Sequence, residues 1–286
     1  MVEPIGTRHR TMQRLRRLSG RRSARTDERA YVIEGPILLA DALDAGVPVE
    51  EVVAEPDCPE GLLERAARAG ATVHRTRPGA LARVVDAVTP RPVAAVARFA
   101  VPSPAEAAAA AGPLALVLVG VSDPGNAGTL LRSAEAAGAG AVVFCDGSVD
   151  PYSPKCVRAS AGALFRLAVV RDAPSADALA ALGGAGYRTI ATLARSARPY
   201  DEADLGDRVA LVLGSEAHGL PGAVASLVDE AVTIPMAGRA ESLNVAMAGT
   251  ILCFESLRRR RQAGAGAEQP NRLDDTPLRA AGCTTR

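Results

Sequence analysis

The alternation of apolar and polar positions divides the chain into two α/β parts. In residues 25–99, short β-rich runs alternate with stretches at helical spacing, which predicts a small α/β domain. The runs are YVIEG, EEVVAEP, ATVHRT and VAAVARFA, and the helical stretches are PILLADALDAG, EGLLERAARAG and ALARVVDAV. Residues 100–112 are rich in Pro and Ala and lack an alternating apolar face. We therefore expect a linker there, with a short Ala-rich helix as the alternative.

Residues 113–262 predict a second, larger α/β domain. Apolar runs such as LALVLVGV, AVVFCD, LFRLAVV and RVALVLG alternate with helical stretches. Strands that are apolar throughout are typical of a mostly parallel sheet covered by helices on both faces. The last helical stretch ends in four Arg, where cations are favourable for the helix dipole. The polar segment 263–286 is expected to be a disordered tail.

The N-terminal end is strongly basic, although the formal net charge of the chain is only +1. Residues 1–30 contain nine Arg against Glu3, Asp27 and Glu28, and we treat residues 1–24 as a basic arm. Such an arm suits contacts with nucleic-acid phosphates, and a solubilising tail is the alternative.

Among the basic residues, Lys155 is the only Lys. A preference for Arg fits both bidentate phosphate recognition and a GC-rich genome. With four Phe, four Tyr and no Trp, base stacking is poorly supplied, so any nucleic acid would be held chiefly by cations.

The cysteines indicate neither a metal site nor a disulfide framework. Cys58, Cys145, Cys156, Cys253 and Cys283 show no CxxC spacing, and their odd number favours reduced thiols inside the cell.

The basic N-terminus is not followed by an apolar h-region, and no window approaches eighteen apolar residues. We therefore expect neither secretion nor membrane association, and we expect a cytoplasmic protein without a metal.

A first candidate segment, DPGNAGTLLR, runs from Asp123 to Arg132 and follows a predicted strand directly. Pro124 and Gly125 form a turn, and Asn126 lies near the start of a helix. A strand, turn and helix start of this type creates a polar pocket at the carboxyl end of the strand. Taken alone, an ordinary turn with Asn126 as N-cap and Arg132 in solvent explains the segment equally well.

A second candidate segment, LVLGSEAHGL, covers residues 211–220 and also ends an apolar strand. Gly214 would let a ligand approach the backbone closely, with Glu216 in the turn beyond it. A tight turn with an exposed Glu is the alternative. His218 has no partner at ligand spacing, and we interpret it as structural or facing solvent.

A third candidate segment, TIPMAGRAESLNVAMAGT, covers residues 233–250. It places a strand, a polar loop and then Ser242, Leu243 and Asn244 at the start of a helix. Ser242 is a competent N-cap, and capping is compatible with a role in a site.

In their order and form, the three segments together resemble the SpoU, or TrmH, family of RNA methyltransferases in the SPOUT superfamily. The family shows an N/DPGNxGxxxR segment, a GSExxGL segment and an IPM…SLNV segment. Residues 153–165 (SPKCVRASAGALF) are similar to the region between the first two. The resemblance covers residues 113–260. Residues 25–99 resemble, less specifically, the family's small substrate-binding domain, whose fold is similar to that of an RNA-binding ribosomal protein.

The resemblance implies a fold, a cofactor and an assembly. It implies an α/β fold with a C-terminal trefoil knot, an exception to the rule that chains do not thread loops. It implies S-adenosylmethionine, bound by Thr192, Leu193, Gly214, Ile234, Met236 and Leu243. It also implies a homodimer to which the C-terminal helix, residues 243–261, contributes. No GxGxxG follows any strand, which disfavours the alternative of a Rossmann-type methyltransferase.

The reaction implied is methylation of a ribose 2′-hydroxyl in RNA. The residues matching the family's catalytic positions are Arg132, Asn126, Glu216, Ser242 and Asn244. The family pattern assigns the Arg as the base, but a guanidinium keeps its proton at neutral pH. We therefore expect Arg132 to clamp a phosphate and stabilise the developing alkoxide.

The separate N-terminal domain favours 23S ribosomal RNA as the substrate over tRNA, which is the alternative. A catalytically inactive RNA-binding protein is a rival from a different class. It is disfavoured because none of the five catalytic positions has been lost.

Overall fold

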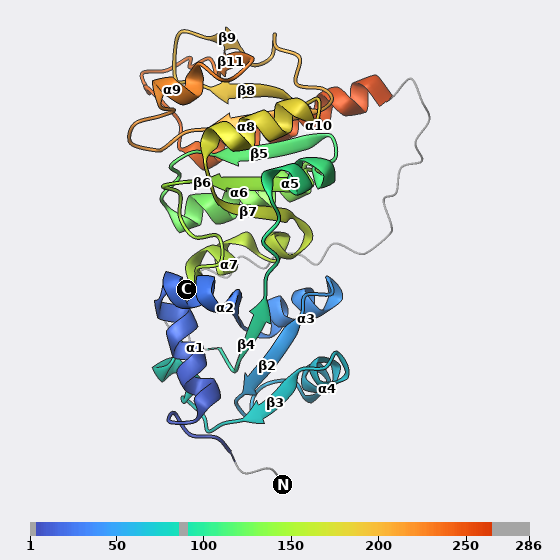
Figure 1. Ribbon diagram of the computed structural model, residues 1–286, viewed down its shortest axis with the longest axis vertical. Coiled ribbons are helices and arrows are strands. Elements are labelled where there is room, and N and C mark those ends of the chain that lie inside the picture. The colour runs from blue at the N-terminus through green and yellow to red at the C-terminus, as the bar shows by residue number, and fades with distance from the viewer. Residues whose placement is uncertain (1–3, 86–90, 265–286) are drawn as a thin grey trace.

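The computed structural model describes residues 4–85 and 91–264, which form two α/β units stacked along one long axis (Figure 1). The N-terminal unit contains a four-stranded sheet of order β1-β4-β2-β3. In it, β4 is antiparallel to β1 and β2, and β3 is parallel to β2. The elements of this unit are α1 (Arg10–Gly20), α2 (Arg22–Glu28), β1 (Ala30–Glu34), α3 (Pro36–Asp44), β2 (Val49–Ala54), α4 (Glu60–Arg68), β3 (Thr72–Arg75), the 3-10 turn η1 (Leu81–Arg83) and β4 (Val93–Arg98).

The C-terminal unit contains a seven-stranded sheet of order β7-β6-β5-β10-β8-β11-β9, in which every neighbouring pair is parallel. Its first elements are α5 (Pro104–Ala110), β5 (Leu114–Leu118), α6 (Pro124–Ala136), β6 (Ala141–Cys145), α7 (Pro154–Ser160), η2 (Ala163–Arg166), β7 (Ala168–Ala173) and α8 (Ser175–Gly184). Its remaining elements are β8 (Arg188–Thr192), β9 (Arg198–Pro199), β10 (Val209–Leu213), α9 (Gly222–Ala225), β11 (Glu230–Thr233) and α10 (Val245–Gly264). The predicted mostly parallel α/β class is therefore confirmed, and the trefoil knot stays a prediction.

Buried strands explain the continuous apolar runs. All residues of β5, β6 and β10 are buried, because helices cover both faces of the sheet. One apolar cluster lies under α6, α7 and α10, and a second lies under α5 and α8. The parallel order brings the carboxyl ends of β5, β8 and β10 to one edge of the sheet, where ligands bind in folds of this kind.

The predicted basic arm of residues 1–24 is wrong as a separate segment for residues 10–24, and residues 1–3 of it lie outside the described residues. Helix α1 is amphipathic and buries Met12, Leu15 and Leu18 against one face of the four-stranded sheet. These three side chains are fully buried, so residues 10–24 are part of the N-terminal unit. The charges of this region are typical of an arm, but the apolar residues between them form the buried face of α1.

The linker prediction is also corrected, in favour of its alternative. Ser103 and Glu106 form a reciprocal capping box at the start of α5. Ala107, Ala108 and Ala111 are buried in the core of the C-terminal unit. The Ala-rich stretch is thus a helix that covers one face of the seven-stranded sheet.

Two further predictions concern segment ends. The helical stretch predicted over residues 80–88 is only the 3-10 turn Leu81–Arg83 where it is described. Helix α10 continues to Gly264, two residues past the predicted end of the C-terminal domain. The rest of the predicted tail, residues 265–286, lies outside the described residues, as does Cys283.

The two units share a tight interface. Arg25 Nε donates to Asp150 Oδ2 at 2.7 Å, and both side chains are buried. Arg158 Nη1 donates to Glu34 Oε1 at 3.0 Å. Phe99 stacks on the ring of Tyr152, with 4.0 Å between the ring centroids. Polar pairs and aromatic packing thus hold the N-terminal unit against α7 and its preceding loop.

Candidate active site

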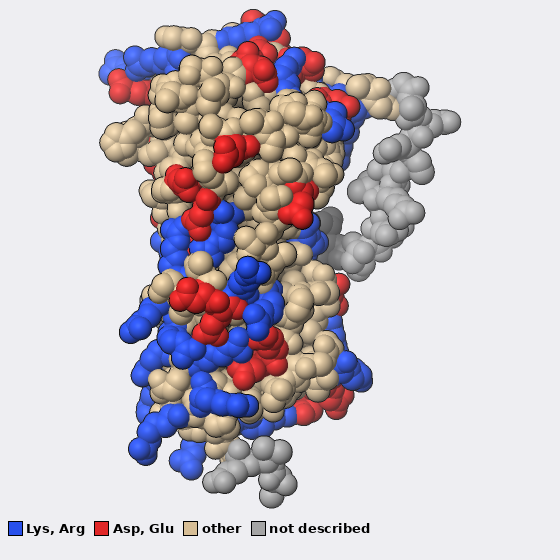
Figure 2. All heavy atoms as spheres, viewed as in Figure 1, with Lys and Arg blue, Asp and Glu red and all other residues tan. Residues whose placement is uncertain are grey.

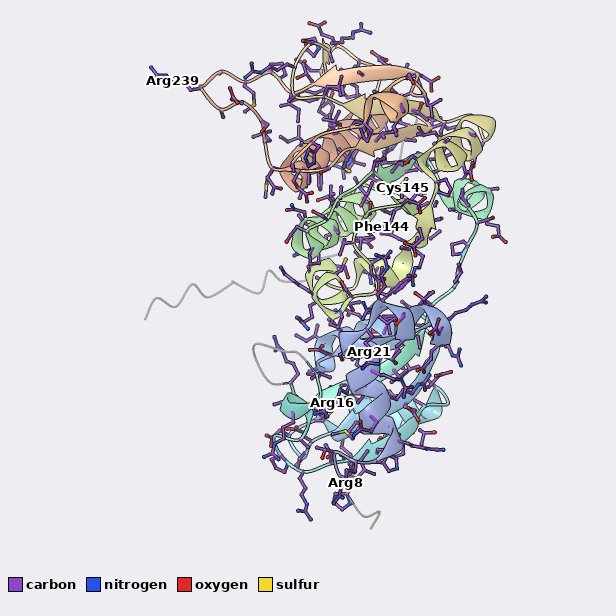
Figure 3. The ribbon with its side chains drawn as sticks, turned by 60° about the vertical axis from the view of Figure 1, so that its left-hand side comes forward. Arg8, Arg16, Arg21, Phe144, Cys145 and Arg239 are labelled. Carbon is purple, nitrogen blue, oxygen red and sulfur yellow. The ribbon has the colours of Figure 1, made fainter. Side chains whose placement is uncertain are left out.

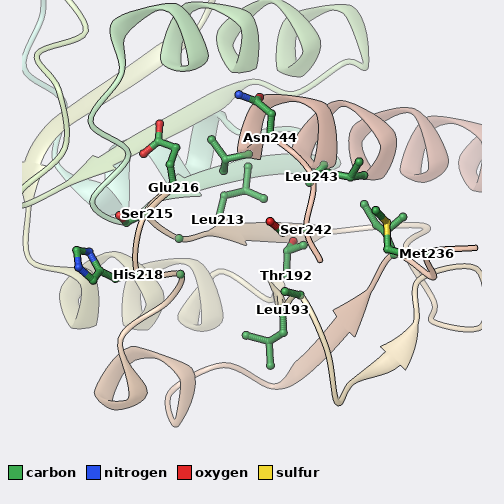
Figure 4. A pocket seen from close by; sticks show the side chains of 16 residues that line it. Thr192, Leu193, Leu213, Ser215, Glu216, His218, Met236, Ser242, Leu243 and Asn244 are labelled. Carbon is green, nitrogen blue, oxygen red and sulfur yellow. The ribbon is translucent and has the colours of Figure 1, made fainter. Parts of the chain in front are cut away.

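A pocket of about 530 Å³ lies at the carboxyl ends of β8 and β10 and extends to the loop before α10 (Figure 4). Its volume falls in the range typical of small-molecule sites. The lining combines apolar side chains with a few polar groups. The lining residues are Thr192, Leu193, Ala194, Leu213, Gly214, Ser215, Glu216, His218, Gly219, Ile234, Met236, Ser242, Leu243, Asn244, Val245 and Ala248.

The structure brings together all six residues predicted to bind the cofactor. Thr192, Leu193, Gly214, Ile234, Met236 and Leu243 all line this pocket. Thr192 Oγ1 is buried and has no hydrogen-bond partner among the described residues. A buried hydroxyl without a partner is costly, so a ligand that bonds to it would be stabilised.

Gly214 has a packing role that the sequence did not reveal. A Cβ added to it would lie 2.4 Å from the carbonyl carbon of Gly219 and 2.5 Å from Leu220 N. Ser215 and Gly219 exchange two backbone hydrogen bonds of 2.9 Å, which fold the loop back over Gly214. The missing side chain is thus required to close this loop, whatever approaches it from the pocket.

A directional hydrogen-bond relay joins the three candidate segments. Asn126 Nδ2 donates to Glu216 Oε1 at 2.8 Å, and Asn244 Nδ2 donates to Asn126 Oδ1 at 3.0 Å. Asn244 Oδ1 in turn accepts from the backbone of Ala246 at 2.8 Å. Because the carboxylate can only accept, the orientation of both amides follows from the chemistry of the relay.

The helix caps differ from those predicted. Asp123, not Asn126, is the N-cap of α6, and its Oδ1 accepts from Asn126 N at 2.8 Å. Asn244, not Ser242, caps α10 by accepting from the backbone of Ala246 and Met247. The Asn126 amide is therefore free for the relay, while Asn244 performs both tasks.

Glu216 is held as a carboxylate by several donors. The backbone N–H groups of Ser122 and Asp123 donate to its two oxygens at 3.3 and 3.4 Å. Partial burial alone would raise the pKa of Glu216. Hydrogen bonds from Asn126 and from backbone N–H groups outweigh this effect and hold the pKa below its usual value. Glu216 therefore accepts hydrogen bonds at neutral pH and does not donate them.

Asp123 is likewise held as a carboxylate. The pKa of Asp123 is lowered, chiefly by the backbone N–H of Asn126 that it caps and, against some desolvation, by the charge of Lys155. Lys155 Nζ lies 3.6 Å from Asp123 Oδ2. The turn that supplies the backbone donors to Glu216 is thus itself fixed by the Asp123 carboxylate, which caps α6.

The structure does not bring Arg132 into contact with the other predicted catalytic residues. It lies on α6 with an exposed side chain and is not part of the pocket lining. Within the part of the chain that the structure describes, the Arg132 side chain makes no hydrogen bond or ion pair. Ser242, also exposed, lines the pocket beside Leu243. Three of the five predicted catalytic residues, Glu216, Ser242 and Asn244, therefore line one pocket. Asn126 is hydrogen-bonded to two of them, and Arg132 stands apart on the same helix as Asn126.

Gly128 also has a structural explanation. A Cβ on it would lie 2.3 Å from Ala159 Cβ and 2.9 Å from Ser160 N. Its absence lets α6 and α7 pack closely.

Sequence reasoning missed the backbone donors of Ser122 and Asp123, and the pocket lining by Ser215 and His218. Donors from the main chain carry no side-chain signal, so only their position after β5 could have indicated them. His218 is exposed, as expected for a residue facing solvent, but it borders the pocket.

Other site chemistries find little support in the described parts of the chain. No group of three or more His, Cys, Asp or Glu residues within 4–85 and 91–264 is arranged to hold a metal ion. The described cysteines are all free and buried, and burial raises the pKa of Cys156 to about 12. No helix in these ranges combines the length and apolar character needed to cross a bilayer.

Known proteins match both units of the chain. Residues 113–254 match the SpoU rRNA Methylase family, and residues 10–95 match the MRM3-like substrate binding domain. The chain is 34% identical, over 80% of its length and 89% of the relative, to the 23S rRNA (guanosine(2553)-2′-O)-methyltransferase RlmP of Bacillus subtilis.

Two solved structures match most of the chain. An AdoMet-bound rRNA methyltransferase from Sinorhizobium meliloti has a TM-score of 0.81 at 29% identity, covering 90% of this chain and 97% of that one. The SpoU methyltransferase AviRb from Streptomyces viridochromogenes, in complex with AdoMet, has a TM-score of 0.79 at 28% identity, covering 89% and 100%.

The fold, the site and these matches define an RNA methyltransferase with a separate substrate-binding unit. The chain belongs to the SpoU rRNA methylase family. The family expected from the three sequence segments is thus confirmed, and the second match supports the weaker resemblance of the N-terminal domain.

Proposed function

We propose that this protein transfers a methyl group from S-adenosylmethionine to a ribose 2′-hydroxyl of 23S ribosomal RNA. The relay from Asn244 through Asn126 to Glu216 at the mouth of the pocket carries the proposal. It joins three segments, separate in the sequence, around a single opening. A chain that had become only an RNA-binding protein would have no need to keep this arrangement.

The pocket suits S-adenosylmethionine in size and chemistry. Leu193, Ile234, Met236 and Leu243 offer an apolar surface for an adenine ring, and the buried Thr192 hydroxyl offers a hydrogen bond to a polar atom of the ligand. The cofactor would supply a methyl group on a positively charged sulfur. The carboxylate of Glu216 borders the same pocket and would stabilise positive charge nearby.

The protein's own contribution is mainly alignment of the reacting oxygen. Asn126 and Asn244 are held by each other and by Glu216, so their positions need no reorganisation when RNA binds. Ser242 offers a hydroxyl at the pocket edge. The exposed, unpaired guanidinium of Arg132 would clamp the neighbouring phosphate and stabilise the developing alkoxide, while the proton leaves to water or phosphate.

The N-terminal unit supports ribosomal RNA over tRNA. It matches a substrate-binding domain, and the relative aligned over 80% of this chain is named for 23S rRNA. We place the reaction in the cytoplasm, where bacterial-type ribosomal RNA is made and modified.

We also propose a homodimer through α10. Met247 and Phe254 are 55% and 46% exposed, and they lie seven residues apart on one face of the helix. Contiguous exposed apolar side chains mark an association surface. Sedimentation at micromolar concentration should give the dimer mass. A monomer mass for the wild-type protein would contradict this assembly.

The substrate is tested by mapping ribose methylation in ribosomal and transfer RNA from cells with and without the gene. We expect one 2′-O-methylated nucleotide of 23S rRNA to disappear and to return with the wild-type gene. Loss of a tRNA ribose methyl instead would establish the tRNA alternative. An unchanged methylation pattern would contradict the proposal.

A further inference from the structure

The N-terminal unit lies at one end of the molecule, and β8, whose carboxyl end borders the candidate pocket, lies at the other end (Figure 1). We define the distal basic surface as Arg8, Arg10, Arg16, Arg77 and Arg83, all exposed. Figure 2 shows Lys and Arg side chains gathered along the edge of the N-terminal unit where α1 lies. Figure 3 places Arg8 and Arg16 one above the other along this edge.

The distal basic surface surrounds a cavity with an ordered wall. Arg77 and Arg83 line a cavity of about 490 Å³ together with residues 4–7, and Arg8 and Arg10 follow directly in the chain. Two hydrogen bonds fix the wall at Ile5: its backbone N–H donates to Arg75 O at 2.8 Å, and its carbonyl accepts from the side-chain hydroxyl of Thr76 at 2.8 Å. Arg16 Nη2 donates to the carbonyl of Arg83 at 2.9 Å, which joins α1 to the same wall.

Among the described carboxylates, none forms an ion pair with the arginines of this surface. The neighbouring acids Glu28, Glu50 and Glu51 are instead occupied by Arg14, Arg17 and Arg98. Glu55, close to the hollow, accepts the backbone N–H of Leu81 at 2.9 Å. Among the described residues, no ion pair involves any of the five arginines. Positive charges gathered in this way repel one another and attract a polyanion.

We propose that the distal basic surface binds the phosphodiester backbone of the same RNA whose ribose enters the candidate pocket; this inference rests on the proposed function. A protein partner is disfavoured, because the exposed large apolar side chains of the described residues lie elsewhere, at Ile37, Val101, Leu227, Leu243, Met247 and Phe254. Guanidinium groups suit phosphate contacts, which need no aromatic platform.

Because the interface between the two units is fixed, one RNA molecule would contact the distal basic surface and the candidate pocket at a constant distance from each other. Arg25 and Asp150 form a buried pair, and Phe99 stacks on Tyr152, so the surface and the pocket keep one separation. The RNA must be long or folded enough to reach both. A short fragment carrying the target nucleotide would use the pocket alone.

The test compares two triple variants of the full chain with equal changes in charge. The first is Arg8→Gln, Arg77→Gln and Arg83→Gln. The control is Arg65→Gln, Arg68→Gln and Arg75→Gln, on the α4 side, where Arg65 and Arg75 pair with Asp44 and Glu60. Binding of in vitro transcribed 23S rRNA is measured against salt concentration, and methylation is measured with the same RNA and with a short fragment containing the target.

In the first variant, the slope of the logarithm of the RNA binding constant against the logarithm of the salt concentration should become smaller in magnitude by about two to three. The KM for 23S rRNA should rise on the order of tenfold, with kcat and cofactor affinity unchanged. The control should change neither quantity by more than about twofold. On the short fragment, the first variant and wild type should be equal. Equal weakening in both triple variants, or an unchanged KM in the first, would overturn the surface assignment while leaving the methyltransferase proposal intact. Absence of methylation by the wild-type protein would instead overturn the proposed function.

Discussion

Asn244 donates to Asn126 at 3.0 Å across 118 residues of sequence. This contact connects the cap of α10 to the first turn of α6, and Asn126 passes the connection on to Glu216. Each amide uses both its donor and its acceptor, so a change in one group alters the orientation of the next.

Replacement of Asn244 by Asp should separate capping from catalysis. Asp keeps an acceptor for the first turn of α10, so thermal stability should stay close to wild type. It loses the donor to Asn126 and adds a charge near Glu216, so kcat should fall on the order of 100-fold. Asn126→Ala should lose as much activity, with cofactor affinity retained by calorimetry. Normal turnover in either variant would remove the relay from the mechanism.

Substitutions of Arg132 distinguish a residue that clamps a phosphate from one that accepts the hydroxyl proton. Arg132→Ala should abolish methylation while cofactor affinity is retained, because the residue lies outside the pocket. Arg132→Lys keeps the charge but loses the planar pair of donors, so partial activity is expected. A lysine variant whose rate rises steeply with pH would indicate proton abstraction at this position instead.

Glu216 sets a pH dependence with a definite sign. Its folded-state pKa lies below the ordinary 4.5, so its contribution to stability is present above that value and is lost as pH falls through the lower folded pKa. Methylation should therefore show no inflection from Glu216 between about pH 5 and 9. In unfolding experiments, the stability difference between wild type and Glu216→Gln should shrink below about pH 4.5. A difference that grows on acidification would contradict the assigned direction.

Gly128 should tolerate no side chain. Gly128→Ala brings a methyl group against Ala159 and the backbone of Ser160, so we expect a loss of about 1–3 kcal/mol in the free energy of unfolding. Gly183→Ala in α8 is the matched control, because nothing lies within 4 Å of its added Cβ. That control should be neutral or stabilising by up to about 1 kcal/mol. Equal effects in urea denaturation would refute close packing of α6 on α7.

The buried Arg25–Asp150 pair should be costly to break from one side. Asp150→Ala leaves the Arg25 guanidinium buried without its partner, so we expect a loss of about 3–5 kcal/mol. Replacing both residues with Met and Leu should recover most of this loss. If the single and double variants unfold alike, the pair is not held in the buried interface.

The sequence predicted the parallel sheet because buried strands have a local apolar pattern, which identified β5 and β10. The six proposed cofactor residues came from the family resemblance, and Thr192 and Leu193 among them lie outside the three motif segments. The caps considered from the sequence, Asn126 and Ser242, are not those of the structure, because Asp123 and Asn244 are equally competent cap residues. Only the geometry of each turn selects between them.

Features that depend on distant contacts escaped sequence reasoning. The apolar positions of α1 indicate that one helix face is buried, but not that this face packs on the four-stranded sheet, and the charges suggested a separate arm. The pairing of Arg25 with Asp150 spans 125 residues and has no local pattern. Gly214 was interpreted as a site of ligand approach, whereas its close neighbours, Gly219 and Leu220, belong to the protein itself.

The most direct test uses purified protein, S-adenosylmethionine labelled in its methyl group, and separate 23S rRNA and tRNA substrates, followed by nucleoside analysis. The account predicts label in one 2′-O-methylated nucleoside of 23S rRNA, with transfer lower on the order of 100-fold in Asn126→Ala and abolished in Arg132→Ala, both of which still bind the cofactor. Label on a base, label only in tRNA, or undiminished transfer by both variants would contradict it.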